Sequence, residues 1–163
     1  MIKQAFAPVV DAGTRLLILG SLPGDASLRA GQYYGHPRNA FWRLIGGVIG
    51  RDLAALPYEE RLAALKTGGV GLWDVIASAE RPGSLDAAIR RPEAADLRGL
   101  VAALPKLRAV AFNGGTAARL GRAVLAAPPA GVTLIDLPSS SPAHARPFAD
   151  KAAAWDKLRH TLG

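Results

Sequence analysis

The sequence contains no cysteine. This absence excludes disulfides, thiol nucleophiles, and zinc or iron–sulfur sites built on thiolates. Its three histidines are widely separated along the chain and do not suggest a metal site. The sequence also lacks the Gly-x-Ser-x-Gly nucleophile elbow of α/β hydrolases and the phosphate loop of P-loop nucleotide-binding proteins. We therefore expect no bound metal and no cofactor.

Long hydrophobic runs are also missing. Half of the residues are hydrophobic, but glycine or proline interrupts them repeatedly, so no stretch is long enough to span a bilayer. The N-terminus lacks the basic segment and apolar stretch of a secretory signal. These observations predict a cytoplasmic protein with no membrane partner.

The length and charge of the chain limit its organisation and its partners. A chain of 163 residues can bury one good core, so we expect a single domain over 1–163, and a monomer. The net charge of +7 comes from 20 lysines and arginines against 13 acidic residues. An excess of this kind favours a polyanionic partner such as DNA, although many basic proteins bind no nucleic acid.

Apolar runs of strand length alternate with segments of helical character. We expect strands at 15–19, 70–76, 109–112 and 132–137, and helices at 39–49, 58–66, 93–103, 115–125 and 147–162. Alternation of this kind predicts an α/β fold, a three-layer α/β/α sandwich around a mostly parallel four-stranded sheet. The long irregular segments at 21–38, 77–92 and 138–146 are predicted to be functional loops.

The most informative stretch is 20–42, which reads GSLPGDASLRAGQYYGHPRNAFW. It follows an apolar strand directly, so its glycine-rich start should lie at the carboxyl edge of the sheet. Open α/β folds bind their ligands at that edge. We therefore expect the active site there.

Several motifs in this stretch resemble those of the uracil-DNA glycosylase superfamily. They are Gly20-Ser21-Leu22-Pro23-Gly24, Tyr33-Tyr34 and His36-Pro37-Arg38-Asn39-Ala40-Phe41-Trp42, and the later segments 111–114 and 137–146 fit in the same order. The likeness is greatest to the hypoxanthine (deoxyinosine) DNA glycosylase branch, which is related to the mismatch-specific uracil/thymine branch.

The resemblance implies a monofunctional DNA glycosylase of base excision repair. Such an enzyme flips a deaminated base out of damaged DNA, hydrolyses its bond to the sugar and leaves an abasic site. Hypoxanthine is the favoured base, and the protein would be associated with the nucleoid of a prokaryotic cell. The alternatives are a mismatch-type uracil-DNA glycosylase and a catalytically inactive DNA-binding member of the fold.

The catalytic residue implied by the resemblance is Asn39. Leu22 occupies the place where the mismatch-specific branch has an asparagine, and a leucine cannot orient a water molecule. In the hypoxanthine branch, the asparagine of a His-Pro-Arg-Asn sequence has that role, and Asn39 matches it. An asparagine before a helical segment is also a common N-cap, so both roles stay open.

Substrate contacts are expected from the same loop and from the strand end at 113. The resemblance assigns the flipped base to the loop Gly20, Ser21, Leu22, Pro23 and Gly24, with Tyr34 as a stacking shelf. His36 is either a donor to the substrate or a bridge within the loop. Asn113 either reads a base edge or forms a turn after its strand.

DNA contacts are expected mainly from the late loop, residues 138–146. The resemblance makes Ser139, Ser140 and Ser141 phosphate-contact candidates, with Ala143 or His144 near the gap left by the flipped base. Arg38 is a further phosphate-contact candidate. The uracil branch has a histidine where this chain has Leu137, which weakens the case for efficient uracil excision. Asp74 lies in a segment that also resembles the hypoxanthine branch, but we expect a structural role for it.

Overall fold

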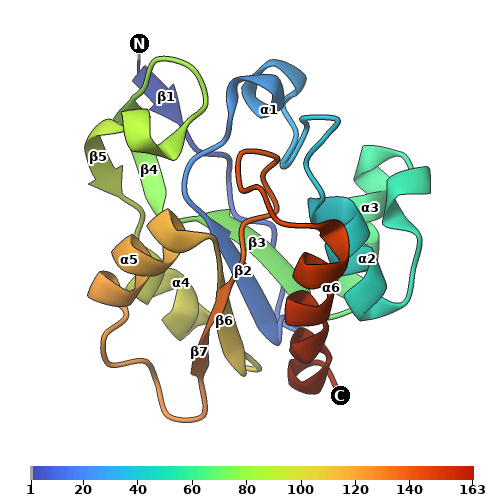
Figure 1. Cartoon of the computed structure of the whole chain (residues 1–163). Coiled ribbons are helices and arrows are strands. Elements are labelled where there is room, and N and C mark those ends of the chain that lie inside the picture. Colours follow the sequence, from blue (N-terminus) through green and yellow to red (C-terminus); the bar gives the residue numbers. More distant parts are fainter. Residues whose placement is uncertain (1) are drawn as a thin grey trace.

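The computed structural model describes residues 2–163, and its centre is a four-stranded parallel sheet (Figure 1). The strand order is β3 (Val70–Asp74), β2 (Leu16–Gly20), β6 (Ala109–Asn113), β7 (Thr133–Leu137). Leu16 is aligned with both Val70 and Ala109, so the strands end close together at the carboxyl edge. The predicted four-stranded parallel sheet is confirmed.

Helices cover both faces of this sheet, because alternate residues of its strands are apolar on opposite sides. Leu16 and Ile18 pack into one core, and Leu17 and Leu19 pack into the other. Fully buried strands of this composition are typical of parallel sheets. The first core is covered by α2 (Phe41–Ile49), α3 (Tyr58–Thr67) and α6 (Phe148–Asp156), and the second by α4 (Leu97–Ala103) and α5 (Gly115–Val124).

A second, antiparallel sheet was not expected. It has the order β1 (Ile2–Gln4), β4 (Ile76–Glu80), β5 (Arg90–Ala94). The expected strand at 70–76 is therefore wrong in extent, because the chain turns at Val75, whose N–H donates to the Gly20 carbonyl. The helix expected from 93 begins at Leu97 instead, because 93 and 94 belong to β5. The sequence of β5, RRPEA, is exposed throughout and has no apolar alternation that would indicate a strand.

The remaining elements are short. Helix α1 (Asp25–Ala30) lies within the segment 21–38, which was expected to be irregular. The expected helix at 147–162 is α6 followed by a 3₁₀ turn at Lys157–Thr161, and other 3₁₀ turns occupy Leu53–Ala55 and Asp86–Ala88. None of the helices in residues 2–163 is both long enough and apolar enough to cross a membrane.

Other parts of the chain contact both outer edges of the parallel sheet. At the β3 edge, Val9 and Leu72 exchange two backbone hydrogen bonds of 2.9 Å. At the β7 edge, the outward carbonyls accept from side chains of the flanking helical segments. Arg122 donates to Leu134 (3.4 Å) and Lys157 donates to Asp136 (3.3 Å).

Candidate active site

The carboxyl edge of the parallel sheet holds a cavity of about 450 Å³, here called the edge cavity. Its walls come from the loops after β2 and α1, the ends of β3 and β6, the 3₁₀ turn at Asp86–Ala88 and the late loop. Every site residue predicted from the sequence lines it except Arg38, which is exposed nearby in the chain. The residues that line it are Gly20, Ser21, Leu22, Pro23, Gly24, Tyr34, His36, Asn39, Asn113, Ser139, Ser140, Ser141, Ala143 and His144.

Gly20 lies where three segments meet. A Cβ atom at this position would lie 2.7 Å from Asp74 Oδ1 and 3.1 Å from the Tyr34 hydroxyl, so only glycine permits the close approach of these groups. The next residue, Ser21, is buried, and its hydroxyl donates to Asp86 Oδ1 at 2.7 Å. The strand end therefore places two carboxylates and a phenol around one short loop.

The rest of this loop is held by the protein itself. Leu22 packs into the core beneath α4 and α5. The Pro23 carbonyl accepts from the fully buried guanidinium of Arg81, which also donates to the carbonyl of Gly83. Leu22 and Pro23 thus fix the shape of the cavity wall.

Asn39 forms a turn before α2 and lines the edge cavity at the same time, but it is not the helix N-cap that the sequence left open, because Ala40 has that position. Its Oδ1 accepts from the backbone N–H of Phe41 at 3.0 Å, in the first turn of α2. A carbonyl oxygen has two lone pairs, so this contact leaves one acceptor site of Asn39 available. The neighbouring His36 accepts from the Arg38 N–H through Nδ1 (3.1 Å), which places the ring proton on Nε2.

Tyr34 forms part of the cavity wall with an unusual backbone conformation. Its φ is 53°, in the left-handed region. Its ring stacks on Phe41, with centroids 3.9 Å apart and planes 15° apart, so one face of the ring is already covered. Its hydroxyl is buried and has no hydrogen-bond partner among the described residues. Burial, with the charge of Asp74 as a second cause, raises the pKa of this phenol.

Tyr33 has a different role from its neighbour. It is 4% exposed, and its hydroxyl donates to the carbonyl of Ala7 at 2.9 Å. Phe41 and Trp42 are buried in the same core, as expected from the sequence. The aromatic cluster beneath the cavity is therefore structural, with Tyr34 at its surface.

Asn113 links the end of β6 to the late loop. Its Nδ2 donates to Ser140 Oγ, its Oδ1 accepts from Ser140 N–H, and both distances are 2.9 Å. The Ser140 carbonyl in turn accepts from the N–H of Ala40 at 3.0 Å. Neither a base-reading role nor a simple turn describes this geometry alone, because the Asn113 amide holds the late loop against the motif around Asn39.

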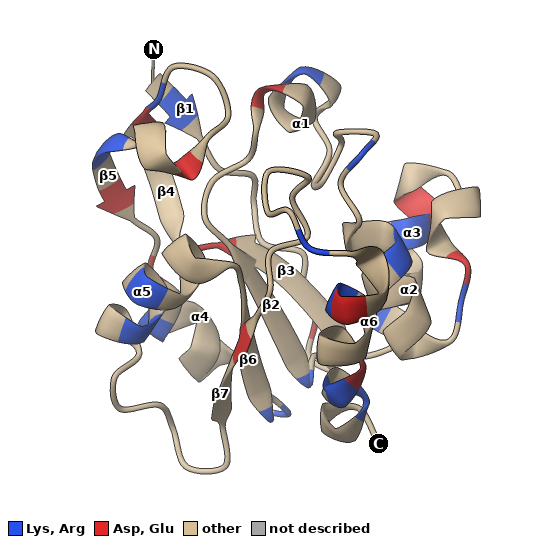
Figure 2. Cartoon of the chain, viewed as in Figure 1, with Lys and Arg blue, Asp and Glu red and all other residues tan. Residues whose placement is uncertain are grey.

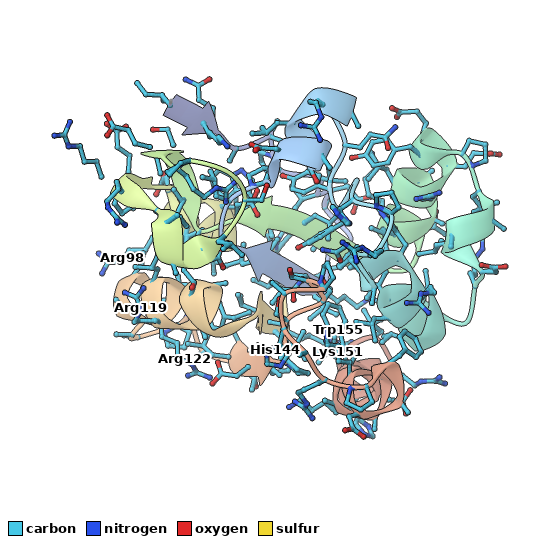
Figure 3. All side chains as sticks on the ribbon, turned by 45° about the horizontal axis from the view of Figure 1, so that its top comes forward. Arg98, Arg119, Arg122, His144, Lys151 and Trp155 are labelled. Carbon is cyan, nitrogen blue, oxygen red and sulfur yellow. The ribbon has the colours of Figure 1, made fainter. Side chains whose placement is uncertain are left out.

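Helix α6 holds the late loop from the other side. The indole N–H of Trp155 donates to the Pro138 carbonyl at 3.0 Å, and Lys151 Nζ donates to the Ser141 carbonyl at 3.1 Å. Lys151 is only 4% exposed, and burial is the main cause that lowers its pKa, with Arg146 as a second cause. Figure 3 shows these two side chains of α6 directed toward the loop that carries His144.

Asp74 is a cavity residue for which the sequence did not predict a site role. It ends β3, it is 3% exposed, and its Oδ2 has no hydrogen-bond partner within residues 2–163. Burial, and next the charge of Asp86, raise its pKa to about 7, while Arg81 acts in the opposite direction. The available signal was its place at the end of an apolar run, at the same sheet edge as Gly20 and Asn113.

The rim of the cavity is exposed and not strongly charged. Leu85 is 61% exposed, and Ala143 and His144 on the late loop are exposed as well. Figure 2 shows lysines and arginines distributed over several elements, including β1, β5 and α5. The described part of the chain has no cluster of three or more histidine, aspartate or glutamate side chains that could hold a metal ion.

Comparison with known proteins identifies the family. The sequence model of the Uracil DNA glycosylase superfamily matches residues 7–159. The chain belongs to the uracil DNA glycosylase superfamily. The resemblance seen in the motifs is therefore confirmed, and the parallel sheet with its edge cavity is a superfamily domain that fills nearly the whole chain.

Relatives within the superfamily are similar over most of their length. A hypoxanthine DNA glycosylase of Methanosarcina acetivorans is 43% identical over 161 residues, which cover 98% of this chain and 100% of the relative. A hypoxanthine DNA glycosylase of Methanosarcina barkeri is 51% identical over 114 residues, 70% of this chain and 72% of that one. The solution NMR structure of a candidate uracil DNA glycosylase from M. acetivorans is 42% identical, covers both chains completely and has a TM-score of 0.88.

Proposed function

We propose that this superfamily member is a monofunctional DNA glycosylase that removes a deaminated base, with hypoxanthine favoured, and leaves an abasic site. The observation that carries the proposal is the convergence of Tyr34, Asn39 and Asn113 on one cavity. The full-length similarity to a hypoxanthine DNA glycosylase supports the choice of base. The cavity of about 450 Å³ lies within the usual range of small-ligand sites, roughly 300–1,000 Å³.

The chemistry requires a base turned out of the duplex and a water at the sugar carbon. Cleavage of an N-glycosidic bond develops positive charge on the sugar, as in glycoside hydrolysis. The free lone pair of Asn39 Oδ1 would orient the attacking water, while its other lone pair holds Phe41 N–H. The contact with Phe41 N–H fixes the direction of the amide, so that it is preorganised for this role.

DNA contacts are assigned to the exposed parts of the rim. Ser139 and Ser141 of the late loop would approach phosphates, and Arg38 would add a further contact from outside the cavity. Ala143 or His144 would lie near the gap left by the flipped base. Ser140 is buried against Asn113, so its contribution would be to hold the loop.

Uracil is the second candidate substrate. It would enter the same cavity, but Leu137 provides no donor where the uracil branch has a histidine. A DNA-binding member without catalysis is the third possibility. A chromosomal substrate would place the protein inside the cell. One chain supplies all the walls of the edge cavity, which is consistent with a monomer.

The test is single-turnover release of base from oligonucleotide duplexes containing deoxyinosine, uracil or xanthine. Wild type should release hypoxanthine faster than the other bases. Asn39→Ala should lower that rate by about 100-fold or more, because the side chain that orients the attacking water is lost. Asn39→Asp is the matched variant, since a carboxylate can still accept from Phe41 N–H and from water. If Asn39→Ala releases hypoxanthine as fast as wild type does, the catalytic assignment is contradicted. If the protein binds DNA but releases no base, the alternative of a DNA-binding member without catalysis is favoured.

A further inference from the structure

We propose that Asp74 reads the extruded base as a neutral carboxylic acid. Its hydroxyl would donate to the base carbonyl oxygen, and its own carbonyl oxygen would accept from the adjacent ring N–H. This inference rests on the proposed glycosylase function and assigns the group that recognises the base edge. It gives a binding role to a residue for which the sequence suggested only a structural one.

The geometry singles out Asp74 among the polar side chains of the edge cavity. Its Oδ2 is buried and has no partner among the described residues, although most buried polar atoms in proteins are hydrogen-bonded. Two other polar side chains of the wall already have partners: the Asn113 amide binds Ser140 and keeps one N–H and one lone pair, and the Ser21 hydroxyl donates to Asp86. A ligand in the cavity would complete the hydrogen bonding of Asp74.

Tyr34 is the second unsatisfied group of the same wall. Its buried hydroxyl also has no partner in the described structure, and it approaches the same point beside Gly20 as Asp74 Oδ1. Because Gly20 has no side chain, both groups can lie close to it, and both residues line the edge cavity. Two adjacent unsatisfied polar groups match a base edge that carries both a donor and an acceptor.

The surroundings of Asp74 favour the protonated acid. The charged groups that face it are Asp86 of the 3₁₀ turn and Arg81, which follows β4. Arg81 donates to the carbonyls of Pro23 and Gly83, and its remaining terminal nitrogen has no partner within residues 2–163. The described residues show no ion pair between Arg81 and Asp74. With burial and Asp86 both raising its pKa to about 7, the carboxyl holds its proton below pH 7 and is about half protonated at pH 7.

The remaining titratable groups near Asp74 come from the loop after α1 and from the late loop. Tyr34 and Tyr33 have hydroxyls whose pKa values are raised by burial, with Asp74 as a further cause, so both stay neutral. His36 and His144 line the same cavity. Any test of Asp74 must therefore separate it from these two histidines.

The chemistry of deaminated bases explains why the neutral acid is suited to this place. Hypoxanthine, xanthine and uracil each present a carbonyl oxygen beside a ring N–H. A neutral carboxyl offers one donor and one acceptor to this pair, whereas an ionised carboxylate offers acceptors only. As the glycosidic bond breaks, its electron pair goes to the base, and a donor at the carbonyl oxygen stabilises that charge.

The decisive experiment compares Asp74→Asn with Asp74→Ala in single-turnover release of hypoxanthine between roughly pH 5.5 and 8.5. An asparagine amide retains one donor and one acceptor but does not ionise. We expect the wild-type rate to fall above about pH 7. Asp74→Asn should keep its rate within about fivefold of wild type at pH 6, and its rate should not fall at alkaline pH. Asp74→Ala should be slower than Asp74→Asn by about 30-fold or more over the whole pH range.

Two results would overturn the proposal. An alkaline fall that persists in Asp74→Asn would belong to a group other than Asp74. A loss in Asp74→Asn as large as in Asp74→Ala, with both proteins folded by circular dichroism, would mean that the ionised carboxylate is required.

A second measurement does not depend on turnover. A duplex with a 2′-fluoro-arabino inosine nucleotide resists cleavage, because the fluorine disfavours positive charge on the sugar, and its affinity can be measured directly. Wild type and Asp74→Asn should bind it more tightly than Asp74→Ala at pH 6. If wild type releases no base but shows this pattern, the glycosylase proposal fails and base reading by Asp74 stands. Equal binding by all three proteins overturns the role of Asp74, whatever the activity.

Discussion

The side-chain oxygen of Asn39 has two roles, and such double roles are typical of single residues in this site. The amide accepts from Phe41 N–H and would hold the attacking water with its other lone pair. Asn113 has a similar double position, at the cavity and on the late loop. In both cases a backbone contact fixes the direction of a side chain, so stability and activity depend on different lone pairs of the same group.

Variants of Asn39 should therefore separate stability from activity. Asn39→Ala should lower the free energy of unfolding by about 1 kcal/mol, because the acceptor for Phe41 N–H is lost. Asn39→Ser should recover part of that stability, since a serine hydroxyl can form the same turn more weakly. Its shorter side chain should not recover base release. Urea unfolding and single-turnover assays on both variants check this, and parallel losses of stability and activity would contradict it.

Asp74 should make the stability of the protein depend on pH. Its pKa is about 7 in the folded protein against an ordinary value of 3.8, so between these values the folded state holds a proton that the unfolded chain has released. Stability should then fall as pH rises from about 4 to 7. Asp74→Asn should remove this fall and be more stable than wild type at pH 8 by up to roughly 4 kcal/mol, since a shift of about three pKa units corresponds to about 1.4 kcal/mol for each unit. Urea unfolding at several pH values tests the sign, and equal slopes in both proteins would refute it.

At the scale of elements, the late loop is held by three neighbours. Asn113 of β6 binds Ser140, the start of α2 binds the Ser140 carbonyl, and α6 donates from Trp155 and Lys151. An irregular loop with this many anchors is fixed at its base, while its exposed tip at 142–146 remains free to meet DNA. The position of α6 thus contributes to the shape of the cavity mouth.

Lys151→Met should loosen this loop while keeping most of the side-chain volume. Without its donor, the Ser141 carbonyl loses its contact with α6, and DNA affinity should fall by about fivefold to tenfold. The rate at saturating enzyme should change less than the affinity. Lys157→Met, on the exposed 3₁₀ turn after α6, is the charge-matched control. An equal loss in both variants would show that only net charge matters.

The elements differ in how well the sequence predicts them, and burial explains the difference. The strands of the parallel sheet are apolar on both faces, so short uniform runs were enough to find them. Strand β5 is exposed throughout, and its pairing with β4 has no apolar signature. The site loops were found because their motifs were recognisable, whereas Asp74 was missed since its proton depends on Asp86 and on burial, which only the folded chain brings together.

For the whole molecule, the net charge of +7 is spread over the surface, as Figure 2 shows. Long-range attraction to DNA should therefore be general, and recognition should come from the edge cavity. Raising the salt concentration from about 50 to 200 mM should weaken binding to undamaged and inosine-containing duplexes in parallel. The preference for inosine should persist, and fluorescence anisotropy with both duplexes measures this. Loss of the preference with salt would assign recognition to charge instead.

The closed edges of the parallel sheet have a consequence for self-association. An open edge offers unpaired N–H and carbonyl groups to a strand from another molecule. Here Val9 covers Leu72 on one side, and Arg122 and Lys157 occupy the outward carbonyls of β7 on the other. Deleting residues 1–10 should expose β3 and produce strand-paired oligomers in light scattering, which the full chain should not form. The segment before β2 would thus protect the β3 edge from pairing with a strand of another molecule.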